Sequence, residues 1–150
     1  MTDAAQQLDG FLAKYTAEVE AQARRAVERM QRRIPGAAIL VYDNYNALAI
    51  GFGPTDKASA AVLSLAVFPR WVTLCFLQGS ALTDPEGLMK GTGTRVRHIR
   101  LTSPEMLDDP RVDGLIAQAV QRAEPPFDAN AQHRLIIKSI SAKQRPRRAE

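Results

Sequence analysis

The sequence has little of the chemistry that metal centres and disulfide scaffolds need. Among 150 residues there is one cysteine, Cys75, and there are two histidines, His98 and His133. A single cysteine excludes an internal disulfide and any thiol-rich metal site. It lies in a strand-like run, residues 71–77, where a free cysteine most often acts as a small buried apolar side chain. A two-histidine metal site would need carboxylates from elsewhere, so we predict no metal site and no cofactor.

Long hydrophobic runs are also missing. No apolar stretch approaches the roughly 20 residues that cross a bilayer, and residues 1–10 lack the basic start and apolar run of a signal peptide. We therefore expect a cytoplasmic protein that makes no membrane contact.

Sequence motifs of catalysis are absent as well. There is no nucleophile-elbow pattern around a serine and no His-Glu-x-x-His run. The glycines of residues 90–95 match neither the P-loop nor the dinucleotide fingerprint, and a strand rather than a helix is expected after them. No motif argues for an enzyme, and whether the chain catalyses a reaction stays open.

The positive charge is concentrated at one end of the chain. The formal net charge is +4, and residues 141–150 hold four cations against Glu150, which leaves +1 for residues 1–140. A broad nucleic-acid footprint on the folded body is therefore not expected. We predict that residues 141–150 form a basic flexible tail that cannot contribute to a core and can be removed with little loss of stability. Its four cations allow at most a weak, salt-sensitive contact with nucleic acid.

Apolar periodicity predicts the first half of the fold. Helical spacing predicts two N-terminal helices, over about residues 8–15 and 19–34, with a break near Thr16 and an end at Pro35-Gly36. Short β-type runs then predict an antiparallel meander of four strands at about residues 37–43, 47–53, 60–68 and 71–78. The connections between these strands are too short for parallel crossovers.

The second half is less regular. We expect a long loop over residues 79–94 with one helical turn near 85–89, and a fifth strand over 95–101. Proline after an N-cap residue predicts helix starts at Ser103 and Asp109, and a last β-type run spans 135–140. The prediction is one α+β domain over residues 1–140. It has an antiparallel sheet of about five or six strands, with N-terminal and C-terminal helices packed on one face.

Several short segments carry a resemblance to a known family. They are Ile34-Pro35-Gly36, Val41-Tyr42-Asp43-Asn44-Tyr45, Ile50-Gly51-Phe52, Phe68-Pro69-Arg70-Trp71-Val72, Phe76-Leu77-Gln78-Gly79, Leu88-Met89-Lys90-Gly91 and Val96-Arg97-His98-Ile99-Arg100-Leu101. In this order and spacing, over about residues 3–123, the chain resembles the YdhG-like family of bacterial domains of unknown function. The resemblance implies the same sheet-with-helices fold.

One branch of that family has been linked to frataxin-like iron delivery, which implies a carboxylate-rich surface because hard iron cations prefer oxygen ligands. The sequence departs from this requirement. Its long N-terminal helix carries Arg24, Arg25, Arg29, Arg32 and Arg33. An iron-binding chaperone is therefore a disfavoured alternative.

Two polar clusters are candidates for a binding site. The first is the expected hairpin at residues 42–46, where turn chemistry explains the asparagines and the aspartate but does not require two flanking tyrosines. The second is the glycine-rich segment from Lys90 to Arg95 with Arg97 and His98, because loop amides and nearby cations can hold an anion.

Three functional hypotheses follow. The first is a small-molecule or anion-binding module whose residues converge on the open face of the sheet; they are Tyr42, Asp43, Asn44, Tyr45, Lys90, Arg95, Arg97 and His98. The second is an enzyme in which His98 acts as general acid or base beside Asp43 or Tyr45. The third is a protein that forms homodimers through an exposed face or edge of its sheet.

Overall fold

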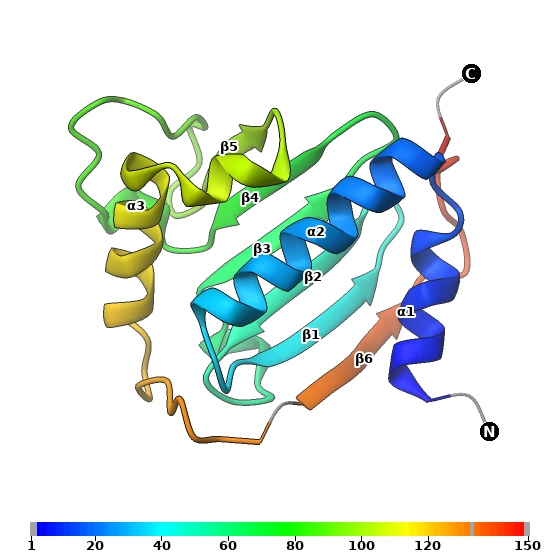
Figure 1. Cartoon of the computed structure of the whole chain (residues 1–150), viewed down its shortest axis with the longest axis horizontal. Coiled ribbons are helices and arrows are strands. Elements are labelled where there is room, and N and C mark those ends of the chain that lie inside the picture. The colour runs from blue at the N-terminus through cyan, green and yellow to red at the C-terminus, as the bar shows by residue number, and fades with distance from the viewer. Residues whose placement is uncertain (1–2, 133, 149–150) are drawn as a thin grey trace.

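The computed structural model describes residues 3–132 and 134–148. It has the predicted α+β architecture, with three α-helices on one face of a six-stranded sheet (Figure 1). The helices are α1 (Ala4–Leu12), α2 (Ala17–Arg33) and α3 (Pro110–Gln121). The strands are β1 (Ala38–Asp43), β2 (Leu48–Gly53), β3 (Leu63–Val67), β4 (Val72–Phe76), β5 (Arg97–Leu101) and β6 (Arg134–Ile140). They lie in the order β5-β4-β3-β2-β1-β6.

Local signals explain where the helices begin. Asp3 and Gln6 form a capping box at α1, and the Thr16 hydroxyl accepts a hydrogen bond from the Val19 amide at the start of α2. The Asp109 side chain caps α3, with Pro110 at its first position as predicted. The other predicted start, at Ser103, leads only into a short 3₁₀ helix, Pro104–Asp108. None of the described helices has the length and apolar composition that crossing a membrane requires.

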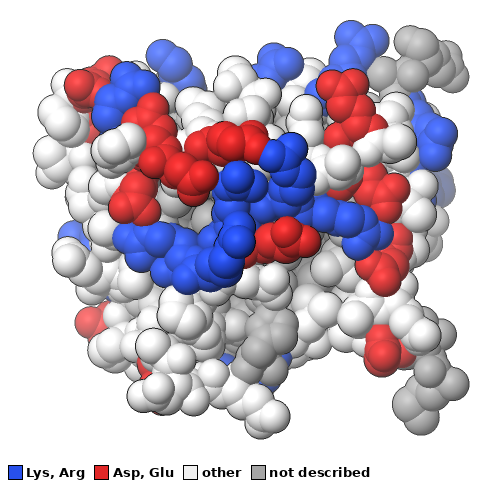
Figure 2. Space-filling model, in the orientation of Figure 1, with Lys and Arg blue, Asp and Glu red and all other residues white. Residues whose placement is uncertain are grey.

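Most arginines of α2 are engaged in ion pairs. Figure 2 shows basic side chains gathered at the centre of this face with acidic side chains around them. Arg25 and Arg29 pair with Glu105, Arg29 also reaches Asp108, Arg33 pairs with Asp113, and Arg24 pairs with Asp9 and Glu20. Four of these six pairs join α2 to the short 3₁₀ helix before α3 or to α3 itself. Four of the five arginines of α2 are therefore paired with the protein's own carboxylates.

The strands β1 to β4 form the antiparallel meander that the sequence predicts, and β5 extends it. The strand β6 differs from the expectation of an antiparallel sheet because it pairs with β1 in parallel. After α3 the chain runs past one end of the strands to the other edge of the sheet, through residues 122–132, before β6 begins (Figure 1). That long connection permits a parallel pairing, which the short turns of the meander exclude.

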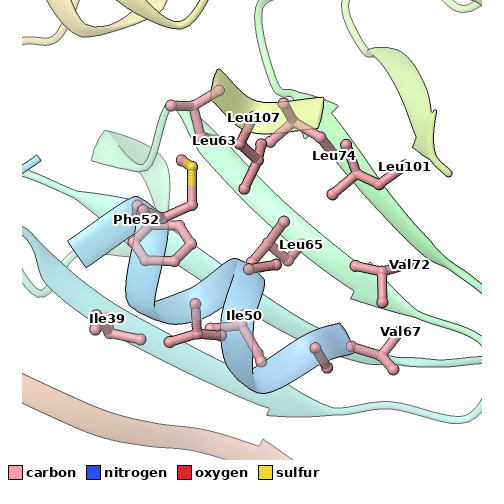
Figure 3. Close-up of a cluster of buried hydrophobic side chains, with 14 of the residues drawn as sticks. Ile39, Ile50, Phe52, Leu63, Leu65, Val67, Val72, Leu74, Leu101 and Leu107 are labelled. Atoms are coloured by element: carbon pink, nitrogen blue, oxygen red, sulfur yellow. The ribbon is translucent and has the colours of Figure 1, made fainter. Parts of the chain in front are cut away.

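The core lies between the helices and one face of the sheet. Alternate residues of the strands are buried beneath α2, among them Ile50, Phe52, Leu65 and Leu74 (Figure 3). The residues between them in sequence point to the opposite side. We call this side the helix-free face, and its centre is built from small residues: Ala49, Gly51, Ser64, Ala66, Thr73 and Cys75.

Candidate functional site

The two polar clusters predicted to form one site lie at opposite ends of the sheet. Antiparallel neighbours alternate in direction, so β1 and β5 run the same way, and Asp43 ends β1 whereas Arg97 begins β5. The strands β2, β3 and β4 also separate them, which places β1 and β5 roughly 19 Å apart at ordinary strand spacing. The shared site expected from the sequence is therefore wrong, and so is the pairing of His98 with Asp43 or Tyr45.

Asp43 is the buried charge at one end of the sheet. Its side chain is 1% exposed and lies between two cations. Lys14 Nζ, from the link between α1 and α2, is 2.7 Å from Oδ2, and Arg147 Nη2 is 2.9 Å from Oδ1. The carboxylate is thus compensated on both oxygens, as a buried charge must be.

Burial acts on the pKa of Asp43 in the upward direction, since it penalises the charged form. The hydrogen bonds from Lys14, Gln144 and Arg147 act in the opposite direction and together outweigh burial. The pKa of Asp43 is therefore held below its usual value, and the carboxylate is ionised at neutral pH. It is a structural anion here rather than a proton donor.

Residues 141–148, which we call the C-terminal segment, wrap around the turn that follows Asp43. The amide of Ser141 donates to the Asp43 carbonyl oxygen at 2.8 Å, and the amide of Arg145 donates to the Tyr45 carbonyl oxygen at 2.9 Å. The Arg147 side chain is 3% exposed. The predicted solvated tail therefore differs from the structure, because a buried aspartate at the end of β1 attracts one of its arginines.

Tyr15 lies next to this ion pair. Its hydroxyl donates to the Val67 carbonyl oxygen at 2.7 Å and accepts from the Leu48 amide at 3.2 Å. Burial raises the pKa of Tyr15, and Arg147 partly offsets that increase. With both its donor and acceptor functions used on backbone groups, this tyrosine fixes the strand ends.

The remaining residues of the first cluster face the other side or solvent. Tyr42 lies on the helix-free face opposite Ala49, and burial raises its pKa. Asn44 and Tyr45 are exposed and border an open depression of about 530 Å³ with Ala49 and Ala66 on its floor. Tyr45 also carries the Arg145 guanidinium over its ring at 5.6 Å.

The second cluster is only partly assembled. Lys90 and His98 are paired backbone to backbone, with N···O distances of 2.8 and 2.9 Å, so their side chains share the helix-free face. Arg97 lies on the other face, and its Nη1 donates to the carbonyl oxygens of Gly93 and Val96. Arg95 is exposed, and its carbonyl oxygen accepts from the Ser80 amide. The Arg97 side chain therefore holds the loop and does not join Lys90, and Arg95 holds the loop through its backbone.

Across from His98 lies Cys75, and beyond it Ser64, in one row on the helix-free face. His98 uses both its backbone groups toward Lys90, so its pairing with Cys75 is the non-hydrogen-bonded kind, in which side chains come closest. Burial raises the pKa of the Cys75 thiol, and a hydrogen bond involving Ser64 offsets part of this effect. The thiol is therefore protonated at neutral pH, which disfavours a nucleophilic role.

The sequence hypotheses missed Arg100 as a site residue. It lies two residues after His98 on the same face and stacks over the Trp71 ring at 4.2 Å. Together with Arg70 and Trp71, and with Glu18 and Gln22 of α2, it lines an open depression of about 430 Å³. Alternation along β5 was the available signal, since it already places residues 98 and 100 on one face.

Lys90, His98 and Arg100 form what we call the basic edge. Within residues 3–132 and 134–148, none of the three side chains has a hydrogen bond or ion pair to a carboxylate. The glycine at position 91 has φ +118°, and a Cβ there would be 3.5 Å from His98 Nδ1. The backbone thus approaches the imidazole closely without covering it with a side chain.

A metal centre has no visible basis among the residues that the structure describes. No group of three or more histidine, cysteine, aspartate or glutamate side chains is placed to hold a metal ion there. The carboxylates near α2 form ion pairs with its arginines instead.

Comparisons of the chain with family models, curated proteins and solved structures find no match. The resemblance to the YdhG-like family accordingly stays a prediction from the sequence.

Proposed function

We propose that this protein is a small-molecule-binding module that takes a small anion, with a carboxylate or phosphate group, on the basic edge of the helix-free face. The observation that carries the proposal is the grouping of Lys90, His98 and Arg100 on one sheet face without a carboxylate partner among the described residues. The arginines of α2, in contrast, are mostly paired with acids.

The geometry suits recognition of an anionic group. Lys90 and His98 are direct cross-strand neighbours, and Arg100 follows on the same strand, so three nitrogen-bearing side chains border one patch. Stacking on Trp71 restrains the Arg100 guanidinium and leaves its N–H edges for a ligand. The small residues Thr73 and Cys75 of β4 form a floor that leaves room beside the cations.

Binding is favoured over catalysis by the same residues. A His98 acid or base would need a polar partner that also contacts a substrate, and its neighbour on β4 is a protonated thiol. The basic edge can nevertheless hold an anion by charge and hydrogen bonding alone. Because the patch is open to solvent, we expect millimolar affinity for a simple anion and weaker binding at higher salt.

Calorimetric or NMR titration with inorganic phosphate and with benzoate tests this proposal. Arg100→Gln should weaken binding by about fivefold, which corresponds to roughly 1 kcal/mol for one charged contact at an exposed site. Arg122→Gln is the matched control, since Arg122 is an exposed arginine at the end of α3. If both variants lose binding equally, or if neither anion shifts signals of the basic edge, the proposal is wrong.

A further inference from the structure

The turn after Asp43 has the construction of a receptor for a planar cation. Its acceptors are one Asp43 carboxylate oxygen and the carbonyl oxygens of Asn44 and Tyr45, and all three receive N–H groups from the Arg147 guanidinium. The ring of Tyr15 lies 6.0 Å from the same guanidinium carbon. Three oxygens and an aromatic ring therefore converge on a single group.

We propose that this turn is a guanidinium-binding site, and that Arg147 occupies it as a displaceable intramolecular ligand. The chemical class it would take from outside is a guanidinium group, carried either by a small molecule or by an arginine side chain. This site is separate from the basic edge, because β2, β3 and β4 lie between β1 and β5, and the basic edge attracts the opposite charge.

The fit of Arg147 leaves one of its donors unused. Nη1 and Nη2 reach the three oxygens, but the buried Nε has no hydrogen-bond partner among the described residues. A guanidinium usually meets a carboxylate through two parallel N–H groups, whereas here only Nη2 contacts Asp43. The three acceptors thus fit the two terminal nitrogens of the guanidinium. The nitrogen that joins the guanidinium to the rest of the Arg147 side chain, Nε, does not find an acceptor.

The C-terminal segment is otherwise attached by polar contacts. Apart from Arg147, its residues are exposed or half-buried, and none belongs to the hydrophobic core. Its other links include hydrogen bonds from Ser141, Gln144, Arg145 and Arg148 to the Asp43 turn and to Lys14. Gln144 also accepts a hydrogen bond from Lys14 Nζ at 2.7 Å, and Arg145 stacks over the Tyr45 ring. Water can replace such bonds more readily than it can replace core packing, so the segment is suited to leave without unfolding the sheet.

Lys14 keeps the emptied site folded. Its Nζ lies 2.7 Å from Asp43 Oδ2, on the carboxylate oxygen that Arg147 does not contact, and it comes from the link between α1 and α2. The carboxylate would therefore retain a counterion when Arg147 leaves. The two carbonyl oxygens and Oδ1 would then be open to a new ligand.

The test is a thermal-shift titration of the full chain carrying Arg147→Ala. We expect methylguanidinium at millimolar concentration and constant ionic strength to raise its melting temperature, by roughly 3 °C at tenfold excess over the dissociation constant. Methylammonium should give no comparable rise. Agmatine and the peptide Gly-Arg-Gly, tested next, distinguish a small-molecule source from a peptide source of the same group.

Two controls make the result specific. The neighbouring variant Arg148→Ala keeps Arg147 in place and should show no response to methylguanidinium. The double variant Asp43→Asn/Arg147→Ala should lose the response of the single variant. If Arg147→Ala does not fold, Arg147→Lys with the same probe replaces it. Equal effects of methylguanidinium and methylammonium, or a response that survives loss of the Asp43 charge, overturn the proposal.

Discussion

The two ends of the sheet use the same residue types in opposite ways. At the end of β1, Arg147 and Lys14 converge on a buried carboxylate, and the C-terminal segment closes over the turn. At the start of β5, Lys90 and His98 meet no acidic side chain among the described residues and stay partly or fully exposed. What separates a structural cation from an available one is the presence of a buried anion, since a surface pair contributes little.

The largest expected loss of stability follows substitution of Asp43. Asp43→Ala should lower the free energy of unfolding by about 3 kcal/mol, because it removes both the anchor of the C-terminal segment and the counterion of Lys14. Urea denaturation measures this directly. The matched control is Asp108→Ala, which removes an aspartate that is 66% exposed and pairs with Arg29; its cost should stay below about 1 kcal/mol. Similar losses in both variants would remove the distinction between the two kinds of ion pair.

Removal of residues 142–150 should have an intermediate effect. The sequence alone predicts almost no loss, whereas the contacts of Arg145 and Arg147 predict a loss of about 2 kcal/mol. For a chain of this size that corresponds to a decrease in melting temperature of roughly 6 °C. Differential scanning calorimetry of the shortened chain decides between the two expectations, and an unchanged melting temperature would favour the solvated tail.

The pH dependence of stability should reveal the Asp43 ion pair. Because the pKa of Asp43 is lower in the folded state than in the unfolded state, its contribution is present above the unfolded value of about 4. The contribution is lost as the pH falls through the folded-state pKa. The difference in stability between the wild type and Asp43→Asn should therefore be full at pH 7 and shrink below about pH 4. A difference that is the same at pH 3 and pH 7 would contradict this.

Changes at the basic edge should have the smallest effect on stability. His98→Gln and Lys90→Gln each should alter the free energy of unfolding by less than about 0.5 kcal/mol, because neither side chain has a hydrogen-bond partner among the described residues. Denaturation of each variant at low and high salt measures this. A decrease in the free energy of unfolding above 1 kcal/mol would show that these side chains stabilise the fold, and would argue against their being available to a ligand.

Local signals were sufficient to predict much of the fold. The caps at Thr16 and Asp109 and the short turns of the meander act over a few residues, so the helices and the four strands could be placed from the sequence. The parallel pairing of β6 could not, because it depends on where a long connection returns the chain.

One feature of the candidate site could have been predicted from the sequence, and another could not. With the fifth strand antiparallel beside the fourth, as in an antiparallel sheet, the end of the first strand and the start of the fifth lie at opposite ends, which argues against the convergence of Asp43 with His98. In contrast, nothing local distinguishes Arg147 from Arg145 or Arg148. Only the folded position of the Asp43 carboxylate selects Arg147 for burial.

A double-mutant cycle between Asp43 and Arg147 tests the central claim most directly. The free energies of unfolding of the wild type, Asp43→Asn, Arg147→Gln and the double variant give the coupling between the two side chains without assigning it from contacts. We predict a coupling of about 2 kcal/mol, because the pair is buried on both sides. A coupling below about 0.5 kcal/mol, the value typical of exposed pairs, would contradict the claim that a buried carboxylate holds the C-terminal segment in place.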